Sequence, residues 1–208
     1  MGLDTVPYDK IVSTATKISE KGKILSTHMK SAWTTVNSMH GQWDGDRWNS
    51  IATAFNDVEQ SINKLLKYIT ESFSKELESI GTAYSTWDTG SSKDATISTA
   101  ETVQQLDTGT KGEGRLTFDL ETITSLRQQA NTSFNACSDD CNDITSIFTG
   151  LSGWTGSTAD EYKAKVNSMN AKVQADLDKL RDDFDKAMQQ TISSYEKIKT
   201  QIDSKKSD

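Results

Sequence analysis

Apolar side chains recur every three or four residues through most of this 208-residue chain. That spacing aligns them along one face of an α-helix. The pattern runs in four stripes, over residues 11–39, 51–87, 116–151 and 162–202. The single proline, Pro7, suits the first turn of the first helix. The sequence therefore predicts an all-α protein with four long helices.

Two short breaks divide the four stripes into pairs. "HGQWDG" at residues 40–45 separates the first two stripes, and "SGWTGS" at residues 152–157 separates the last two. Each break predicts the turn of a helix–turn–helix hairpin. Side chains suited to cap the helices at their N-termini are Asp4 or Thr5, Asp46 and Ser157.

The segment between the two hairpins has a different composition. Residues 89–114 are rich in Gly, Ser and Thr and poor in large apolar side chains, which is typical of a linker. A short helix over residues 95–106 is compatible with this stretch. We therefore divide the chain into a first hairpin (1–88), a polar linker (89–114) and a second hairpin (115–208).

The two hairpins are related by an internal repeat. Trp43-Asp44-Gly45 and Trp154-Thr155-Gly156 both lie at a break, at an offset of 154 − 43 = 111. The same offset pairs Phe73 with Phe184 and Tyr84 with Tyr195. With 5 Trp and 12 Gly in 208 residues, chance would produce about 0.3 Trp-x-Gly triplets. Finding two, each at a helical break, indicates two tandem copies of one hairpin.

Each half resembles the WXG proteins of type VII secretion, also called the Esx or ESAT-like family. The resemblance rests on a hairpin of about one hundred residues with Trp-x-Gly in its turn, and it covers the chain apart from the linker. It implies hairpins that pair in antiparallel fashion as a four-helix bundle. It also implies export without a cleaved signal peptide.

Many members of that family carry a Tyr-x-x-x-Asp/Glu export signal after the second helix. Tyr84-Ser85-Thr86-Trp87-Asp88 matches this motif in the first half. The equivalent stretch of the second half begins at Tyr195 but has Lys199 in place of the acid. The resemblance therefore implies a complete export signal at Tyr84 and Asp88, and a degenerate one at Tyr195.

The length of the linker favours pairing of the two hairpins within one chain. A helix of about 40 residues is about 60 Å long, and the extended linker reaches almost 90 Å. The linker can therefore run back along an antiparallel bundle and make the chain a monomeric pseudo-dimer. This arrangement would place Trp154 and Gly156 near Tyr84 and Asp88. It would place Trp43 and Gly45 near Tyr195 at the other end.

Composition narrows the classes of partner. The chain is 34% hydrophobic and 25% charged, with a net charge of −7. The negative charge disfavours nucleic acid and anionic membrane surfaces. No apolar run is long enough to span a bilayer, and the N-terminus lacks the basic and apolar regions of a secretory signal peptide.

The residues that could carry chemistry do not form a catalytic constellation. His28 and His40 are expected to be ordinary helix and turn residues. Cys137 and Cys141 are expected to be buried small hydrophobes, with a bridge, an intermolecular link or a metal as alternatives. "GTKGEGR" at residues 109–115 lacks the Gly-Lys-Ser/Thr of a phosphate-binding loop. We expect no enzyme activity and no cofactor.

These observations favour an adaptor or carrier that is secreted after a cytoplasmic stage. Its partners would be the secretion ATPase or membrane machinery and a larger effector or toxin. The alternatives are a coiled-coil scaffold that stays in the cell and a membrane-active helical bundle. The tryptophans would serve packing alone, or packing together with recognition by another protein.

Overall fold

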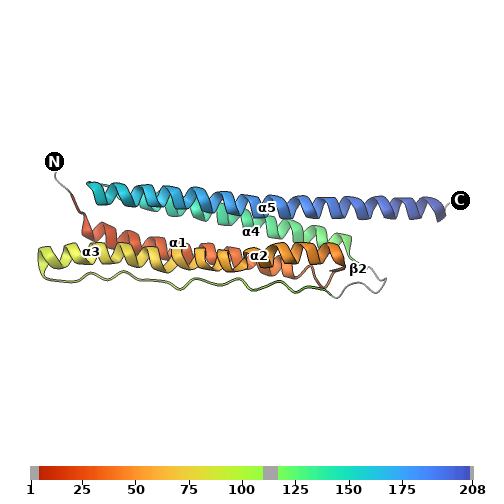
Figure 1. The fold of residues 1–208 in the computed structure, drawn as a ribbon, viewed down its shortest axis with the longest axis horizontal. Helices are drawn as coiled ribbons and strands as arrows, with labels where there is room; N and C mark the ends of the chain where they lie inside the picture. Colours follow the sequence, from red (N-terminus) through yellow and green to blue (C-terminus); the bar gives the residue numbers. More distant parts are fainter. Residues whose placement is uncertain (1–4, 110–116, 207–208) are drawn as a thin grey trace.

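The computed structural model describes residues 5–109 and 117–206, and it confirms an all-α protein. Its helices run side by side along one long axis (Figure 1). In chain order the elements are α1 (Tyr8–Asn37), β1 (Trp43–Asp44), α2 (Asp46–Lys67), the π-helical segment η1 (Tyr68–Phe73), α3 (Ser74–Thr89), β2 (Thr117–Phe118), α4 (Leu120–Thr149) and α5 (Ser157–Lys206).

The helices coincide with the four predicted stripes. The second stripe forms one continuous helical rod, in which α2, η1 and α3 follow one another without a gap. The predicted start of the third stripe, Leu116, lies outside the described residues, and so do Asp4 and residues 110–115 of the glycine-rich stretch. The short β1–β2 ladder was not predicted from the sequence.

The predicted caps are wrong in detail. Pro7 directly precedes α1, and no side chain from residue 5 onward makes a capping hydrogen bond to that helix. Asp46 and Ser157 are the first residues of α2 and α5, so they do not precede these helices as N-caps do. The residue before α2 is Gly45, which has no side chain to cap with.

The two hairpins share one core. α1 packs mainly against α4 and α3, and α4 packs against α5, whereas α2 and α5 contact each other little. Phe55 of α2 lies at the centre of an aromatic cluster. Its ring centroid is 4.7 Å from Trp33, 6.3 Å from Phe134 and 5.8 Å from Phe184. Because the last two rings belong to the second hairpin, neither hairpin completes this core alone.

A buried polar cluster also joins the hairpins. Asp140 of α4 is 3% exposed, and its carboxylate lies 2.8 Å from Lys21 Nζ and 2.7 Å from His28 Nδ1, both on α1. Hydrogen bonding to Asp140 raises the pKa of Lys21. A buried carboxylate is tolerated only with such partners, so these contacts constrain how α1 lies on α4.

Small residues let α1 approach η1 closely. A Cβ atom added at Gly22 would lie 2.8 Å from Thr70 Oγ1 and 2.9 Å from Thr70 Cα. Nearby, the Ser19 hydroxyl donates to the Thr70 carbonyl oxygen at 2.6 Å. The absence of a side chain at Gly22 is therefore what permits this separation of the two helices.

Replacing Gly22 with alanine is expected to destabilise the protein. Alanine improves helix propensity by about 1 kcal/mol, but forcing atoms into a packed contact costs about 1–3 kcal/mol. Urea denaturation should therefore show a net loss of stability. Gly41→Ala is the matched control, because nothing lies within 4 Å of a Cβ atom at that position. Equal stability of the two variants would contradict the close-contact explanation.

Residues 91–109 of the linker are extended, so the short helix that the composition allowed over residues 95–106 does not form. This segment runs along the first hairpin, beginning at the end of α3 (Figure 1). Val103 and Leu106 are 2% and 4% exposed, so they are part of the core. The linker backbone is hydrogen-bonded by side chains of α1 and of the α2–η1–α3 rod, which replaces the internal hydrogen bonds of a helix.

Two predicted apolar stripes run past the end of the core. Trp87 is 86% exposed near the end of α3, and Ile198 and Ile202 are about half exposed on α5. Figure 1 shows the C-terminal part of α5 projecting beyond the other helices. These residues were expected on buried faces, but no neighbouring helix extends far enough to cover them.

Candidate recognition sites at the helical turns

The two Trp-x-Gly motifs occupy equivalent positions. Gly45 directly precedes α2 with φ 141°, and Gly156 directly precedes α5 with φ 108°. L-residues rarely adopt such angles, so glycine is the residue that permits the chain to enter the second helix of each hairpin. Trp43 and Trp154 are each 2% exposed. The motif therefore builds a turn around a buried indole in both halves.

Trp43 anchors the turn of the first hairpin. Its ring packs edge-on against Trp48 at 6.1 Å and against Phe118 at 5.7 Å between centroids. Phe118 in turn lies 4.5 Å from the ring of Tyr195. The structure thus brings Trp43 and Tyr195 to one end of the molecule, with Phe118 between them. Lys199, which replaces the acid of the motif, is exposed there.

Trp154 anchors the turn of the second hairpin, at the opposite end of the molecule (Figure 1). Its ring lies 6.5 Å from Phe148 and 5.7 Å from Tyr162. The neighbouring Thr155 backbone N–H donates to the Thr5 carbonyl oxygen at 3.0 Å, and Thr155 Oγ1 accepts from Thr5 N–H at 3.1 Å. The segment that precedes α1 is therefore fixed to this turn.

The same N-terminal segment connects the turn to Asp88. The Tyr8 hydroxyl donates to Asp88 Oδ2 at 2.7 Å, and this hydrogen bond raises the pKa of Tyr8. Trp154 and Asp88 therefore lie at the same end of the molecule, and residues 5–8 link them. Gly90, with φ 73°, ends α3 just beyond Asp88.

The accessible groups at this end differ from those expected. Tyr84 is 38% exposed and Trp87 is 86% exposed, whereas the Trp154 indole is inaccessible. Trp87 was assigned to a buried stripe and not to the site. Its position between Tyr84 and Asp88 was the sequence signal that could have marked it. A partner at this end would contact Tyr84, Trp87 and Asp88.

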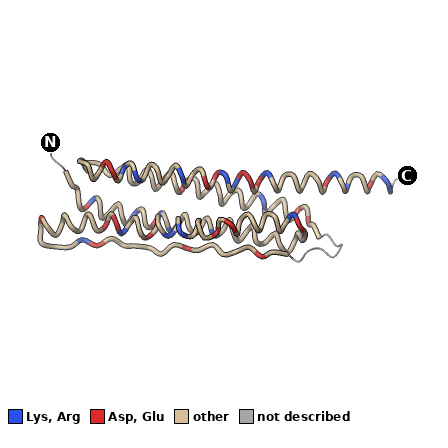
Figure 2. Tube along the Cα trace, in the orientation of Figure 1, with Lys and Arg blue, Asp and Glu red and all other residues tan. Residues whose placement is uncertain are grey.

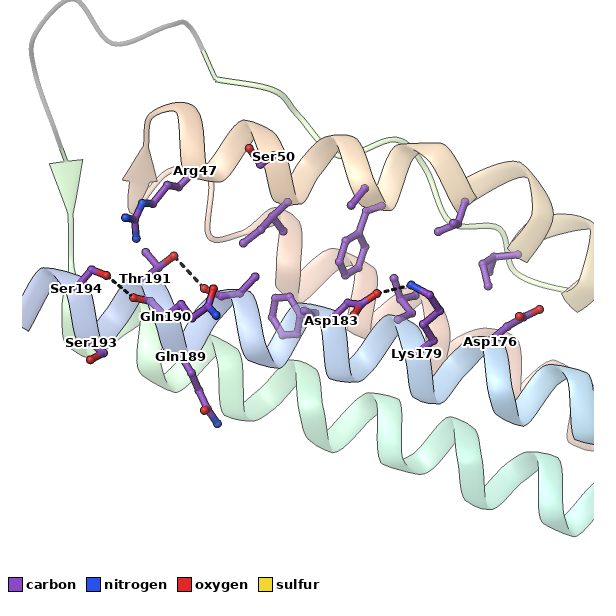
Figure 3. Close-up of a pocket in the computed structure, with 18 of the residues that line it drawn as sticks. Arg47, Ser50, Asp176, Lys179, Asp183, Gln189, Gln190, Thr191, Ser193 and Ser194 are labelled. Atoms are coloured by element: carbon purple, nitrogen blue, oxygen red, sulfur yellow. Dashed lines mark hydrogen bonds and ion pairs between the residues drawn. The ribbon is translucent and has the colours of Figure 1, made fainter.

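A groove of about 1080 Å³ separates α2 from α5. Its lining includes the apolar Phe55, Leu180 and Phe184, and Figure 3 shows polar side chains around them, among them the ion pair of Lys179 with Asp183. Among the described residues, neither a histidine nor a cysteine lines the groove. The groove is therefore an apolar depression with a charged rim.

The other side chains that could take part in chemistry have structural roles. Cys137 and Cys141 are buried and unbridged. Burial raises the pKa of both thiols, that of Cys141 to about 12, so they remain protonated at neutral pH. His40 stacks on Trp48 at 5.8 Å. No group of three or more His, Cys, Asp or Glu residues that could hold a metal occurs within residues 5–109 and 117–206.

Both signs of charge are interspersed along the helices (Figure 2). One cluster fixes the linker: Glu101 accepts hydrogen bonds from Lys23 Nζ and, at 2.9 Å, from Lys30 Nζ. These two lysines lower the pKa of Glu101 from 4.5 to about 2. The linker is thus attached to α1 by an ion pair as well as by its backbone.

The attachment of the linker to α1 is expected to weaken in acid. Because the pKa of Glu101 is lower when it is bound, its contribution is complete above pH 4.5 and is lost as the pH falls towards about 2. An NMR titration of the linker amides should show this change. It should be absent in the Glu101→Gln variant. A midpoint at the ordinary glutamate value would contradict the ion-pair assignment.

Comparisons with known proteins do not identify a family. No family model matches the chain, and neither a curated protein nor a solved structure matches it.

Proposed function

We propose that this chain is a tandem WXG-type adaptor of type VII secretion. The observation that carries the proposal is the equivalence of its two Trp-x-Gly motifs. In each half, a buried tryptophan and a glycine with positive φ directly precede the second helix of a hairpin. Two matching turns at one sequence offset support a duplicated hairpin of the kind that this family uses.

The proposed architecture is an antiparallel four-helix bundle that acts as an intramolecular pseudo-dimer. The packing of α1 on α4 and the Phe55 cluster support pairing of the hairpins within one chain. The extended linker supports it as well, because its path returns along the first hairpin before α4 begins. Light scattering should therefore report a monomer.

The proposed mechanism is recognition of one end of this bundle. The secretion ATPase or membrane machinery would contact Tyr84, Trp87 and Asp88. The buried Trp154 and Gly156 would act indirectly, because Thr155 fixes the segment that carries Tyr8, the partner of Asp88. A larger effector or toxin would travel with the exported bundle. No catalytic step or cofactor is part of this mechanism.

The test is export from cells that carry or lack an active type VII secretion ATPase. The protein should accumulate in the culture supernatant of the first strain and stay in the pellet of the second. A cytoplasmic marker in the same supernatants controls for lysis. Equal release from both strains, or retention in both, would reject the proposal.

A scaffold that stays in the cell is the second candidate. The burial of Trp43 and Trp154 favours it, since packing alone explains two indoles that are each 2% exposed. Retention in the pellet of the ATPase-positive strain is the result expected for a scaffold. Concerning the membrane-active alternative, no helix within the described residues is long and apolar enough to cross a bilayer.

A further inference from the structure

The linker lies in a second groove, which is formed by α1 and the α2–η1–α3 rod. Side chains of both walls make hydrogen bonds to the linker backbone. On the α2 side, the Asn63 carboxamide accepts from Val103 N–H at 2.8 Å and donates to Val103 C=O at 2.9 Å. Asn56 makes the same pair of bonds with Leu106, at 2.6 and 3.1 Å. Each carboxamide thus satisfies both backbone groups of one linker residue, as the neighbouring strand of a sheet would.

This arrangement is periodic. Asn49, Asn56 and Asn63 are seven residues apart and contact Gly109, Leu106 and Val103, which are three residues apart. Seven helical residues rise about 10.5 Å, and three extended residues span about 10 Å. The helix and the extended chain therefore stay in register over successive asparagines. A row of asparagines at this spacing forms a repeating binding surface.

The opposite wall of the groove is formed by α1. Ser19 Oγ accepts from Ser98 N–H at 2.8 Å, Ser26 Oγ accepts from Glu101 N–H at 2.9 Å, and Asn37 Oδ1 accepts from Asp107 N–H at 2.8 Å. Residues 96–109 run parallel to α1 and antiparallel to α2, and side chains of both walls accept hydrogen bonds from backbone N–H groups of this segment. Because contacts of this kind are made to the backbone, they can hold extended segments of many different sequences.

Side chains of the linker add sequence preference. Val103 and Leu106 are buried, and Glu101 is clamped between Lys23 and Lys30. These anchors define a pattern of an acid followed by aliphatic residues two and five positions later. A connector whose only task is to span the hairpin needs neither the anchors nor the hydrogen bonds, because polar backbone is fully satisfied by water.

We propose that the groove between α1 and the α2–η1–α3 rod is a binding site for an extended peptide. Residues 95–109 are its ligand within the chain. The groove accepts, in place of this segment, an extended segment of a partner protein with the same acid and aliphatic pattern. This proposal is independent of the secretion function, since it concerns a surface that Tyr84 and Asp88 do not form.

The test supplies the ligand as a separate peptide. A fluorescent peptide with the sequence of residues 95–109 is titrated against the wild-type chain and against a Val103→Ser/Leu106→Ser chain. In the wild-type chain the tethered segment competes at high effective concentration. Weakening that segment should tighten apparent binding of the free peptide by about tenfold or more, measured by fluorescence anisotropy.

Two controls locate the binding site. A peptide that carries serine at the positions of Val103 and Leu106 should not bind the weakened chain. Asn56→Ala with Asn63→Ala in the weakened chain should reduce binding of the unaltered peptide. Glu101→Lys provides a second weakened chain, in case the first does not fold. It leaves Val103 and Leu106 in place and should show the same direction of change.

The proposal is overturned if the peptide binds neither weakened chain, or if binding is insensitive to the groove asparagines. Light scattering on the same samples tests a different occupant. A dimer formed by exchange of linkers, in place of peptide binding, would make a second copy the ligand and would overturn assignment to a separate partner.

Discussion

Replacing Phe55 with alanine is expected to cost about 3–5 kcal/mol of the free energy of unfolding. The ring is 2% exposed, and it contacts Trp33 of its own hairpin and Phe134 and Phe184 of the other. Its removal would leave a cavity between the surrounding aromatic rings, which cannot all move to fill the space. Urea denaturation followed by circular dichroism measures the loss.

The same experiment tests whether the two hairpins fold as one unit. Because the Phe55 cluster spans both, the variant should still unfold in a single transition at a lower midpoint. Trp87→Ala is the matched aromatic control and should change stability by no more than about 0.5 kcal/mol, since Trp87 is 86% exposed. Two separate transitions, or a similar loss in both variants, would contradict a shared core.

Helical periodicity was sufficient to predict the positions of the helices. The apolar spacing depends on local geometry, so it predicted α1, the α2–η1–α3 rod, α4 and α5. It could not predict where the core ends, which depends on the lengths of neighbouring helices. Trp87, Ile198 and Ile202 follow the helical spacing but are exposed for that reason.

The linker shows a second limit of prediction from sequence. Many of its hydrogen-bond partners are side chains about 40 to 80 residues away, such as Asn63 and Ser19, so no local pattern reveals them. Composition correctly indicated that a helix–turn–helix hairpin does not continue there. The extended conformation and the burial of Val103 and Leu106 follow from tertiary contacts alone.

The turn motifs could be located but not fully interpreted from sequence. The repeat at one offset indicated two equivalent turns, and in the structure Trp43 and Trp154 lie between the two helices of each hairpin. The Trp43 indole packs against Phe118, which is distant in sequence. The Trp154 indole packs against Tyr162, which belongs to the next helix. The structure therefore moves the accessible surface from the tryptophans of the motif to Tyr84, Trp87 and Asp88.

Export is expected to depend on one end of the molecule only. Tyr84→Ala or Asp88→Ala should abolish ATPase-dependent appearance in the culture supernatant, whereas Tyr195→Ala should leave most of it. The physical reason is that the end with Tyr84 offers an exposed ring and a carboxylate. At the other end, Tyr195 packs on Phe118 and Lys199 carries the opposite charge. Immunoblots of supernatant and pellet measure the ratio.

Tyr8→Phe separates recognition of Asp88 from its structural role. This variant removes the hydroxyl that donates to Asp88 Oδ2 at 2.7 Å but keeps the carboxylate. If a partner binds the carboxylate directly, the Tyr8→Phe variant should be exported while the Asp88→Ala variant is retained. If both variants fail alike, the hydrogen bond between the N-terminal segment and α3 is what export requires. Equal loss from Tyr84→Ala and Tyr195→Ala would reject the asymmetry between the two ends.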